Sequence, residues 1–161
     1  MKVLSFDTAT KTGCAFGVAG GKPRSWTVDL GKVVWEARFS KTLRMVRHFV
    51  DKLDPDLITV EAFVGGPKAN TDLAGLVACV MGEAHRLGVP IKAYWPSSIR
   101  SHFLGGARSK APIKQQVYAR CLLLGWTPGD TDQSDALALW DYSCMKENPQ
   151  HAMSSIGGIF R

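Results

Sequence analysis

The sequence lacks the features that mark several classes of protein. Its cysteines are few and far apart, so no two form the closely spaced pair typical of a zinc site. Each lies in or beside an apolar run, which is typical of a free, buried thiol in a reducing cytoplasm (Cys14, Cys79, Cys121 and Cys144). No apolar stretch approaches the roughly 18 residues that suggest a membrane span. The N-terminal segment MKVLSFDTAT is too short and too polar for a signal peptide. We therefore expect a cytoplasmic protein with no membrane contact.

Acidic residues are scarce relative to basic ones. Fourteen Asp and Glu face twenty Lys and Arg, which gives a formal net charge of +6. A basic surface favours a polyanion such as DNA or RNA, because each neutralised phosphate releases condensed counterions. An incidental excess of base in an ordinary protein is the alternative. The rest of the composition, 45% apolar and 21% charged over 161 residues, is typical of one globular domain with its own core.

The hydrophobic pattern changes along the chain from strands to helices. Three short apolar runs with tight turns between them predict an antiparallel meander. Later strands alternate with helices, which implies a parallel half to the same sheet. We expect an α/β fold with a mixed five-stranded sheet flanked by helices, a domain over 1–146 and a flexible tail over 147–161. The strands are predicted at 2–7, 13–19, 25–30, 57–61 and 89–95, and the helices at 39–53, 72–87, 97–104, 112–124 and 132–146.

Four acidic residues occupy positions that a random surface would not choose. Asp7 follows the apolar run of the first strand, and Glu61 follows that of the fourth. Asp132 and Asp135 share one face at the start of the last helix. Ligands collect at strand ends in open α/β sheets, so the four carboxylates converge if those strands are neighbours and the helix packs across them. Any one of the acids could instead serve a turn or a helix cap, Asp132 above all.

Four close carboxylates repel one another unless cations lie between them. Mg²⁺ favours oxygen ligands and keeps several waters. Two such ions about 4 Å apart can hold both the attacking water and the leaving oxygen of a phosphodiester. The joint pattern therefore indicates a metal-dependent nuclease.

Three segments resemble one family. SFDTAT at 5–10 followed by TGCA at 12–15, LITVE at 57–61 and DQSDALA at 132–138 are similar to the acidic motifs of RuvC-type Holliday junction resolvases. These belong to the RNase H-like superfamily. The resemblance extends to about Asp141, and its compact spacing is more similar to phage-encoded members.

The resemblance implies an RNase H-like fold and symmetric nicking of four-way DNA junctions by a homodimer in a bacterial or phage-infected cell. It implies dependence on Mg²⁺, with Mn²⁺ as a substitute. By motif, Asp7, Glu61, Asp132 and Asp135 are its metal-binding catalytic acids. The helix over 72–87, whose apolar surface is broader than one core contact requires, is the expected dimer interface.

The resemblance also suggests residues that contact DNA. A Lys of these resolvases approaches the scissile phosphate, and Lys114 fits that motif better than Lys110. An aromatic wedge follows the second acidic strand, where Phe63 is the candidate. Arg100 and Arg108 could join Phe63 and Lys110 in contacting DNA, although exposed loop side chains would look the same. Core packing is favoured over base stacking for three tryptophans (Trp95, Trp126 and Trp140).

Other functions remain open at this point. A non-catalytic module for branched DNA would keep the basic surface but has no need of four acids. A different RNase H-like nuclease, acting on RNA–DNA hybrids or replication forks, fits the same residues. A lobe of an actin-like kinase also begins with a strand, an Asp and a Thr-Gly hairpin. Such kinases need two lobes and more than 161 residues.

Overall fold

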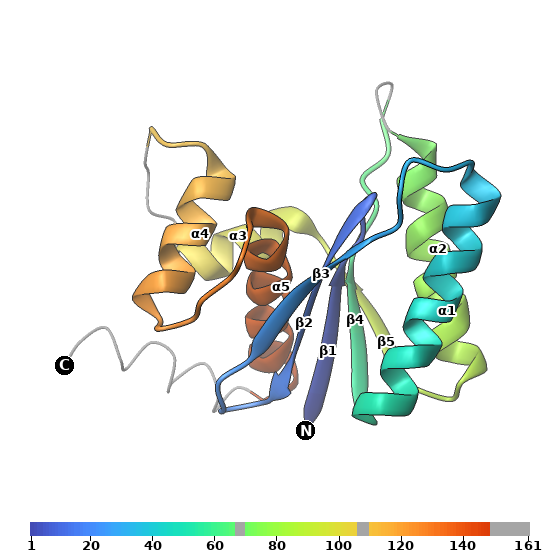
Figure 1. Ribbon diagram of the computed structural model, residues 1–161. Helices are drawn as coiled ribbons and strands as arrows, with labels where there is room; N and C mark the ends of the chain where they lie inside the picture. Colours follow the sequence, from blue (N-terminus) through green and yellow to red (C-terminus); the bar gives the residue numbers. More distant parts are fainter. Residues whose placement is uncertain (67–69, 106–109, 149–161) are drawn as a thin grey trace.

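A mixed five-stranded sheet organises the chain. In the computed structural model, residues 1–66, 70–105 and 110–148 are described. The strands lie in the order β3-β2-β1-β4-β5 (Figure 1). β1, β2 and β3 pair antiparallel, whereas β4 pairs parallel with both β1 and β5. Their bounds are Lys2–Asp7, Lys11–Val18, Arg24–Asp29, Leu57–Glu61 and Ile91–Tyr94.

Helices cover both faces of this sheet. α1 (Trp35–Leu53) and α2 (Thr71–Arg86) lie on one face. α5 (Thr131–Glu147) crosses the other face, with α3 (Pro96–Leu104) and α4 (Ile113–Leu123) packed outside it. The predicted α/β fold with a mixed five-stranded sheet flanked by helices is confirmed.

The core consists of two apolar layers, one on each side of the sheet. β1 contributes to both, because Leu4 and Phe6 face α1 and α2 while Val3 faces α5. A strand buried on both faces reads as a near-continuous apolar run, as this one does apart from Ser5. On the other side, α5 carries fully buried Trp140 and Leu137. α5 is therefore held at a fixed position above the strands.

Some element ends differ from their predictions. α1 begins at Trp35, before the first clear helical repeat at Phe39. α5 ends at Glu147, one residue beyond its predicted end, and the carboxylate of Glu147 accepts hydrogen bonds from Lys92 and Tyr94. Residues 149–161, which make up most of the predicted tail, lie outside the described residues. None of the helices in the described ranges is both long and apolar enough to cross a bilayer.

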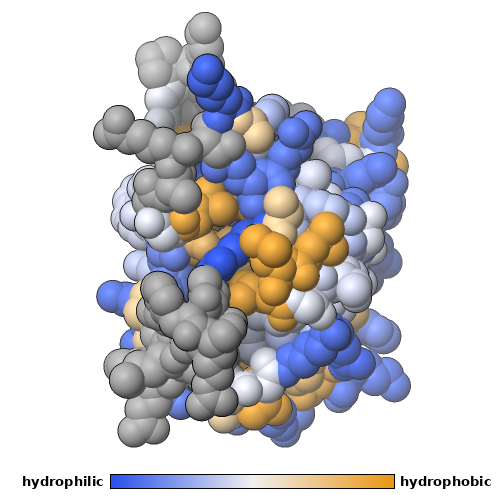
Figure 2. Space-filling model, turned by 90° about the vertical axis from the view of Figure 1, so that its left-hand side faces the viewer, coloured by the Kyte–Doolittle hydropathy of each residue, from blue (hydrophilic) through white to orange (hydrophobic). Residues whose placement is uncertain are grey.

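The surface is not uniformly basic. Figure 2 shows the side of the molecule on which α4 lies, where apolar patches alternate with strongly hydrophilic side chains. α4 carries three exposed apolar residues: Ile113, Leu122 and Leu123. Two basic side chains of α1 form ion pairs within the protein: Arg38 with Asp72 and Arg47 with Glu83. The positive charge is thus partly used within the fold.

Candidate active site

The sheet places two of the four acids side by side. β1 and β4 are parallel neighbours in which Phe6 pairs with Val60. Asp7 and Glu61 are the next residues, so both stand at the carboxyl ends of adjacent strands. This is the edge at which ligands bind in sheets of this kind.

A glycine allows the helix that carries the other two acids to approach. Gly13 of β2 pairs with Asp7, and a Cβ added to Gly13 would lie 2.0 Å from the carbonyl oxygen of Asp132. The same Cβ would lie 3.3 Å from Cβ of Ala136, one turn along α5. Only the absence of a side chain at Gly13 permits this contact. Close packing against α5 therefore explains why the Thr-Gly dipeptide of the hairpin has glycine at position 13.

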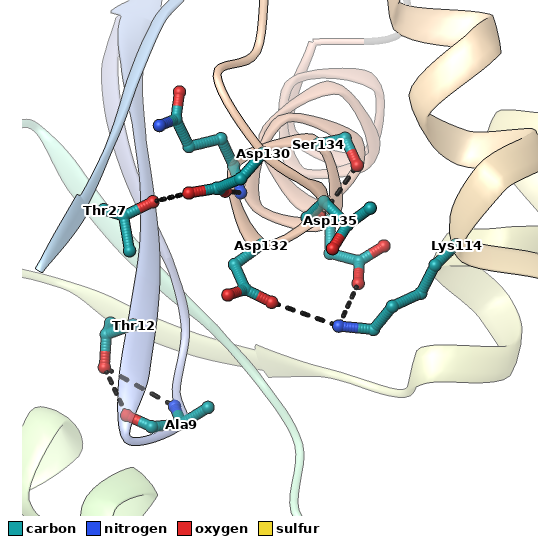
Figure 3. Close-up of polar contacts among 10 residues, drawn as sticks. Ala9, Thr12, Thr27, Lys114, Asp130, Asp132, Ser134 and Asp135 are labelled. Atoms are coloured by element: carbon teal, nitrogen blue, oxygen red, sulfur yellow. Dashed lines mark hydrogen bonds and ion pairs between the residues drawn. The ribbon is translucent and has the colours of Figure 1, made fainter. Parts of the chain in front are cut away.

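A side chain within the hairpin between β1 and β2 stabilises its turn. The hydroxyl of Thr12 donates to the carbonyl of Ala9 over 2.9 Å (Figure 3). Thr12 is almost fully buried. This contact fixes the turn that follows Asp7, and with it the start of the site.

Asp130 caps α5, so the suggestion that Asp132 could be the cap was wrong. The carboxylate of Asp130 accepts a 2.8 Å hydrogen bond from the backbone N–H of Gln133. It also accepts a 2.6 Å hydrogen bond from the hydroxyl of Thr27 on β3 (Figure 3). The cap thus joins the start of α5 to the sheet. It leaves the side chains of Asp132 and Asp135 available for another purpose.

Lys114 of α4 lies between these two side chains. Its Nζ is 3.1 Å from Oδ1 of Asp132 and 3.4 Å from Oδ2 of Asp135 (Figure 3). A single ammonium group therefore bridges both carboxylates of α5. Of the two lysines considered from the sequence, Lys114 is the one at the acids, whereas Lys110 lies exposed before α4.

The electrostatics show that the acids form one cluster. Burial, followed by repulsion from Glu61 and Asp135, raises the pKa of Asp7 to about 8. Burial also raises the pKa of Glu61 and of Asp135, although Arg100 and Lys114 act in the opposite direction. Burial alone would lower the pKa of Lys114, but its hydrogen bond to Asp132 and the charge of Asp135 raise it overall. The cluster carries more negative charge than its two cations neutralise.

A cleft opens beside the cluster. Its volume is about 530 Å³. Asp7 and Glu61 form one part of its wall, and Arg100 of α3 adds a positive charge. Phe63, which is partly buried against the core layer of α1 and α2, also lines it. The remaining wall is mostly apolar and comes from the loop after β4 and from α2 (Val64, Leu73 and Val77).

The other residues singled out from the sequence are dispersed. Arg108 lies outside the described residues. Trp126 and Trp140 are core residues as predicted, but Trp95 is 58% exposed, so the core prediction for it was wrong.

One contact was not foreseen. His102 of α3 lies 2.9 Å from Oδ2 of buried Asp141 on α5, which joins the helix of Arg100 to the helix of Asp135. No local pattern marks such a pair, because the two residues lie 39 positions apart.

The donor set fits a hard divalent cation. All four side chains are carboxylates, and the pKa of Asp7 is raised first by burial and then by neighbouring negative charge, which a cation would offset. Among the described residues, no three Asp, Glu, His or Cys side chains form a ready cage around one ion. Mg²⁺ is usually held by one or two carboxylates together with water and substrate phosphates. The arrangement suits that mode of binding.

Comparison with known proteins identifies the family. The chain is 31% identical over 151 residues to the crossover junction endodeoxyribonuclease RuvC of Parafrankia sp. (strain EAN1pec), with 86% of this chain and 83% of that protein covered. The chain belongs to the RuvC family. The RuvC of Anaeromyxobacter dehalogenans is 30% identical over 147 residues, with 86% and 78% covered. No protein-family model matches the chain.

Solved structures support the RuvC fold. The RuvC structure of Thermus thermophilus superposes with a TM-score of 0.73 at 21% identity, covering 91% of this chain and 96% of that one. The yeast mitochondrial Holliday junction resolvase gives a TM-score of 0.62 at 12% identity, covering 93% and 82%.

Proposed function

We propose that this protein is an endonuclease that resolves four-way DNA junctions by hydrolysing one phosphodiester in each of two strands. The observation that carries the proposal is the assembly of Asp7, Glu61, Asp132 and Asp135 from three distant segments at one end of the sheet. Close packing at Gly13 supports it, because that contact serves to bring α5 up to Asp7. A module that only binds branched DNA has no need to gather these carboxylates.

Asp7, Glu61 and the acids of α5 would hold Mg²⁺, for which Mn²⁺ substitutes. The metal supplies an activated water and neutralises the charge that develops on the phosphate. The carboxylates would hold the metal at the end of the sheet, beside the cleft. The packing of α5 against β1 and β2 keeps the four side chains in a fixed relation, which shortens the search for a reactive geometry.

Two cations of the protein would act on the substrate. Lys114 can turn from Asp132 and Asp135 toward a phosphate once these acids bind metal, since its side chain is 54% exposed. Arg100 lies in the wall of the cleft, where its guanidinium can bind a neighbouring phosphate. Lys110 and Arg108, which precede α4 in the sequence, would also contact the DNA backbone. Phe63 would stack at the opened centre of the junction.

The protein would act as a homodimer in the bacterial cytoplasm, where DNA junctions arise. A four-way junction has two equivalent strands to cut, so two active sites in a fixed two-fold relation match it. α2, on the face opposite α5, offers the surface for this contact. The RuvC of Thermus thermophilus has been solved in complex with a Holliday junction substrate.

The test compares substrates and variants in parallel. Labelled four-way, three-way, flap and RNA–DNA hybrid substrates are incubated with the protein in Mg²⁺, and nicking is followed on denaturing gels. Asp7→Asn, Glu61→Gln and Asp135→Asn should each lower nicking by about 10³-fold or more while binding to the junction persists. Full nicking by the Asp7 or Glu61 variant would contradict the assignment of these acids.

The choice of substrate decides between related activities. Preferential cutting of hybrids or forks by the wild-type protein would assign it to another branch of RNase H-like nucleases, with the same acids. Binding to junctions without nicking in either Mg²⁺ or Mn²⁺ would instead indicate a binding module.

A further inference from the structure

Trp95 is exposed at the start of α3, directly before Pro96, which lines the cleft. It is 58% accessible, whereas Trp126 and Trp140 are 8% and 0% accessible. A large aromatic side chain in water forgoes the stabilisation that burial would give it, so its position invites a functional reason.

The backbone places Trp95 beside the end of β4, the strand that carries Glu61. Glu61 of β4 pairs with Tyr94 of β5, the residue before Trp95. The backbone N–H of Ala62 donates to the carbonyl of Tyr94 over 2.8 Å. Trp95 is therefore next to the segment that leads from Glu61 into the loop of Phe63.

The residues around Trp95 line the cleft. Pro96 follows it and forms part of the cleft wall, as does Arg100 one turn later in α3. On the neighbouring loop, Phe63 lines the same cleft and Val64 is 55% exposed. Apolar side chains and the guanidinium of Arg100 thus line the same cleft as Asp7 and Glu61. Nucleotides present the same combination of chemistry, an apolar base beside an anionic phosphate.

The backbone of Trp95 is held firmly although its side chain is exposed. Its carbonyl accepts hydrogen bonds from Ser98 and Ile99 at 3.0 and 3.1 Å, which start α3. Ile99 is buried in the core layer beside α5, so this start is anchored. An aromatic side chain on a fixed backbone loses little conformational entropy when it binds.

We propose that Trp95 stacks on an unpaired base next to the cleaved phosphate and so selects DNA that is opened at that point. This inference rests on the proposed function, because it assumes a DNA substrate at the acids. Trp95 would work beside Phe63: two aromatic side chains on adjoining segments could hold two bases of an opened junction apart. Duplex DNA, whose bases are stacked on one another, would gain nothing from it.

The experiment measures coupling between Trp95 and single bases. Junctions with one abasic site, moved stepwise along the strand near the cleavage position, are bound to wild-type protein and to Trp95→Ala, both in an Asp7→Asn background that does not cut. On the intact junction, Trp95→Ala should weaken binding about 5- to 150-fold, the range expected for loss of one base–aromatic stack. At one abasic position the wild-type protein should lose a similar factor, while Trp95→Ala loses nothing further. Trp95→Phe should restore part of the affinity.

Trp35 provides the matched control. It is 50% exposed at the start of α1 on the opposite side of the sheet from α5. Trp35→Ala should bind as wild type does and keep the full abasic penalty. A 2-aminopurine at the coupled position gives a readout independent of affinity: its fluorescence should be quenched on binding by wild type and not by Trp95→Ala.

The outcomes separate the two proposals. If wild type neither binds nor nicks junctions, the proposed function fails. If wild type binds and nicks them, but Trp95→Ala shows the same affinity and the same abasic penalty at every position, only the stacking role fails. A change in oligomeric state of Trp95→Ala, with unchanged 2-aminopurine quenching, would assign the indole to self-association and likewise overturn it.

Discussion

At the scale of a single residue, the position of Asp7 lowers the stability of the metal-free protein when its carboxyl is charged. Its carboxyl is surrounded by protein and by other carboxyls, which raise its pKa to about 8. In the unfolded chain it titrates near the ordinary value of 3.8. Folding without metal therefore works against the charged form of Asp7. Such an arrangement is retained where the charge is used, as at sites that bind ions.

This difference predicts a pH-dependent cost to the metal-free protein. Because the folded pKa lies above the unfolded one, the contribution of Asp7 to stability is complete below about pH 4. It declines as the pH rises and is lost above about pH 8. Asp7→Asn removes this dependence. In EDTA at pH 8 the variant should be more stable than wild type by on the order of a few kcal/mol, and the gap should narrow toward pH 5.

Chemical unfolding monitored by circular dichroism measures the two free energies across this pH range. Mg²⁺ at millimolar concentration should stabilise wild type and leave Asp7→Asn less affected, since the variant lacks one ligand. Equal stabilities of the two proteins at pH 8 in EDTA would mean that neither burial nor repulsion raises the pKa of Asp7 in the folded protein.

At the scale of elements, α5 and β2 show how packing sets the geometry of the site. Gly13 leaves no space for a side chain between the strand and the carbonyl of Asp132. Asp130 fixes the same end of α5 to β3 through Thr27. The acids of α5 are thus positioned by two contacts that are not themselves part of the acidic cluster.

Gly13→Ala should therefore impair cleavage more than folding. Its methyl group must push α5 away from Asp7, and a displacement of about 1 Å at a catalytic group can cost roughly 10²-fold in rate. Overpacking of this kind costs about 1–3 kcal/mol of stability. Single-turnover nicking and thermal unfolding measure the two effects.

Gly17→Ala is the control for this prediction. A Cβ at Gly17 would lie 3.0 Å from Pro23 and from Trp140, so it is also crowded, but Gly17 pairs with Val3 at the other end of β1. It should lose stability while the nicking rate of the folded fraction stays close to that of wild type. Equal losses of rate in both variants would show that Gly13 acts through stability alone.

The order of strands and helices could be predicted from the sequence because it depends on local periodicity. The apolar run before Asp7 and the helical repeat of α1 are each legible within a few residues. The convergence of Asp7 with Glu61 was predicted only if their strands are neighbours, because no local pattern in the sequence determines which strands pair. Partners that depend on tertiary distance were not predicted: the bridge of Lys114 to Asp132 and the pair of His102 with Asp141 lie 18 and 39 residues apart.

Helix ends and exposure are where local reasoning misleads. Asp132 was considered as a cap of α5 from the sequence, but the cap is Asp130, two residues earlier. Tryptophan is usually a core residue, but β5 ends at Tyr94 and Trp95, the next residue, is exposed. In both cases the outcome depends on the exact residue at which a helix begins or a strand ends, which local sequence patterns give only to within a residue or two.

At the scale of the whole molecule, net charge governs the encounter with DNA. The chain carries a formal charge of +6, and four of its acids gather at one place. Raising salt from about 50 to 200 mM should weaken junction binding by roughly 10³-fold or more if six or more phosphates are neutralised. Gel shifts of the Asp7→Asn protein over a salt series measure the slope. Lys114→Ala should reduce that slope by about one if Lys114 reaches a phosphate; a flat salt response would show that the basic excess is incidental.

The two-fold character of the junction makes the oligomeric state part of the function. On the outward side of α2, Met81 is 38% exposed, and Ala78 and Gly82 beside it are exposed as well. Small residues let two helices approach closely, and a charge at Met81 would be buried between them without a partner. Met81→Glu should therefore shift a homodimer toward the monomer by tenfold or more in dissociation constant, for a cost of about 1.4 kcal/mol or above. Light scattering over a concentration series measures the shift.

The pattern of cleavage products tests whether the exposed face of α2 is the dimer interface. A dimer bound to a plasmid cruciform can make both nicks before it dissociates, which yields linear DNA. A monomer makes them in independent encounters, so Met81→Glu should accumulate nicked circles while its rate on a single labelled strand at saturating protein falls much less. Leu122→Glu is the matched control, because Leu122 is 51% exposed on α4, across the sheet from α2. It should remain a dimer and yield linear product. A wild-type protein that is monomeric at micromolar concentration and still linearises the cruciform would refute the dimer, since one active site cannot face both strands at once.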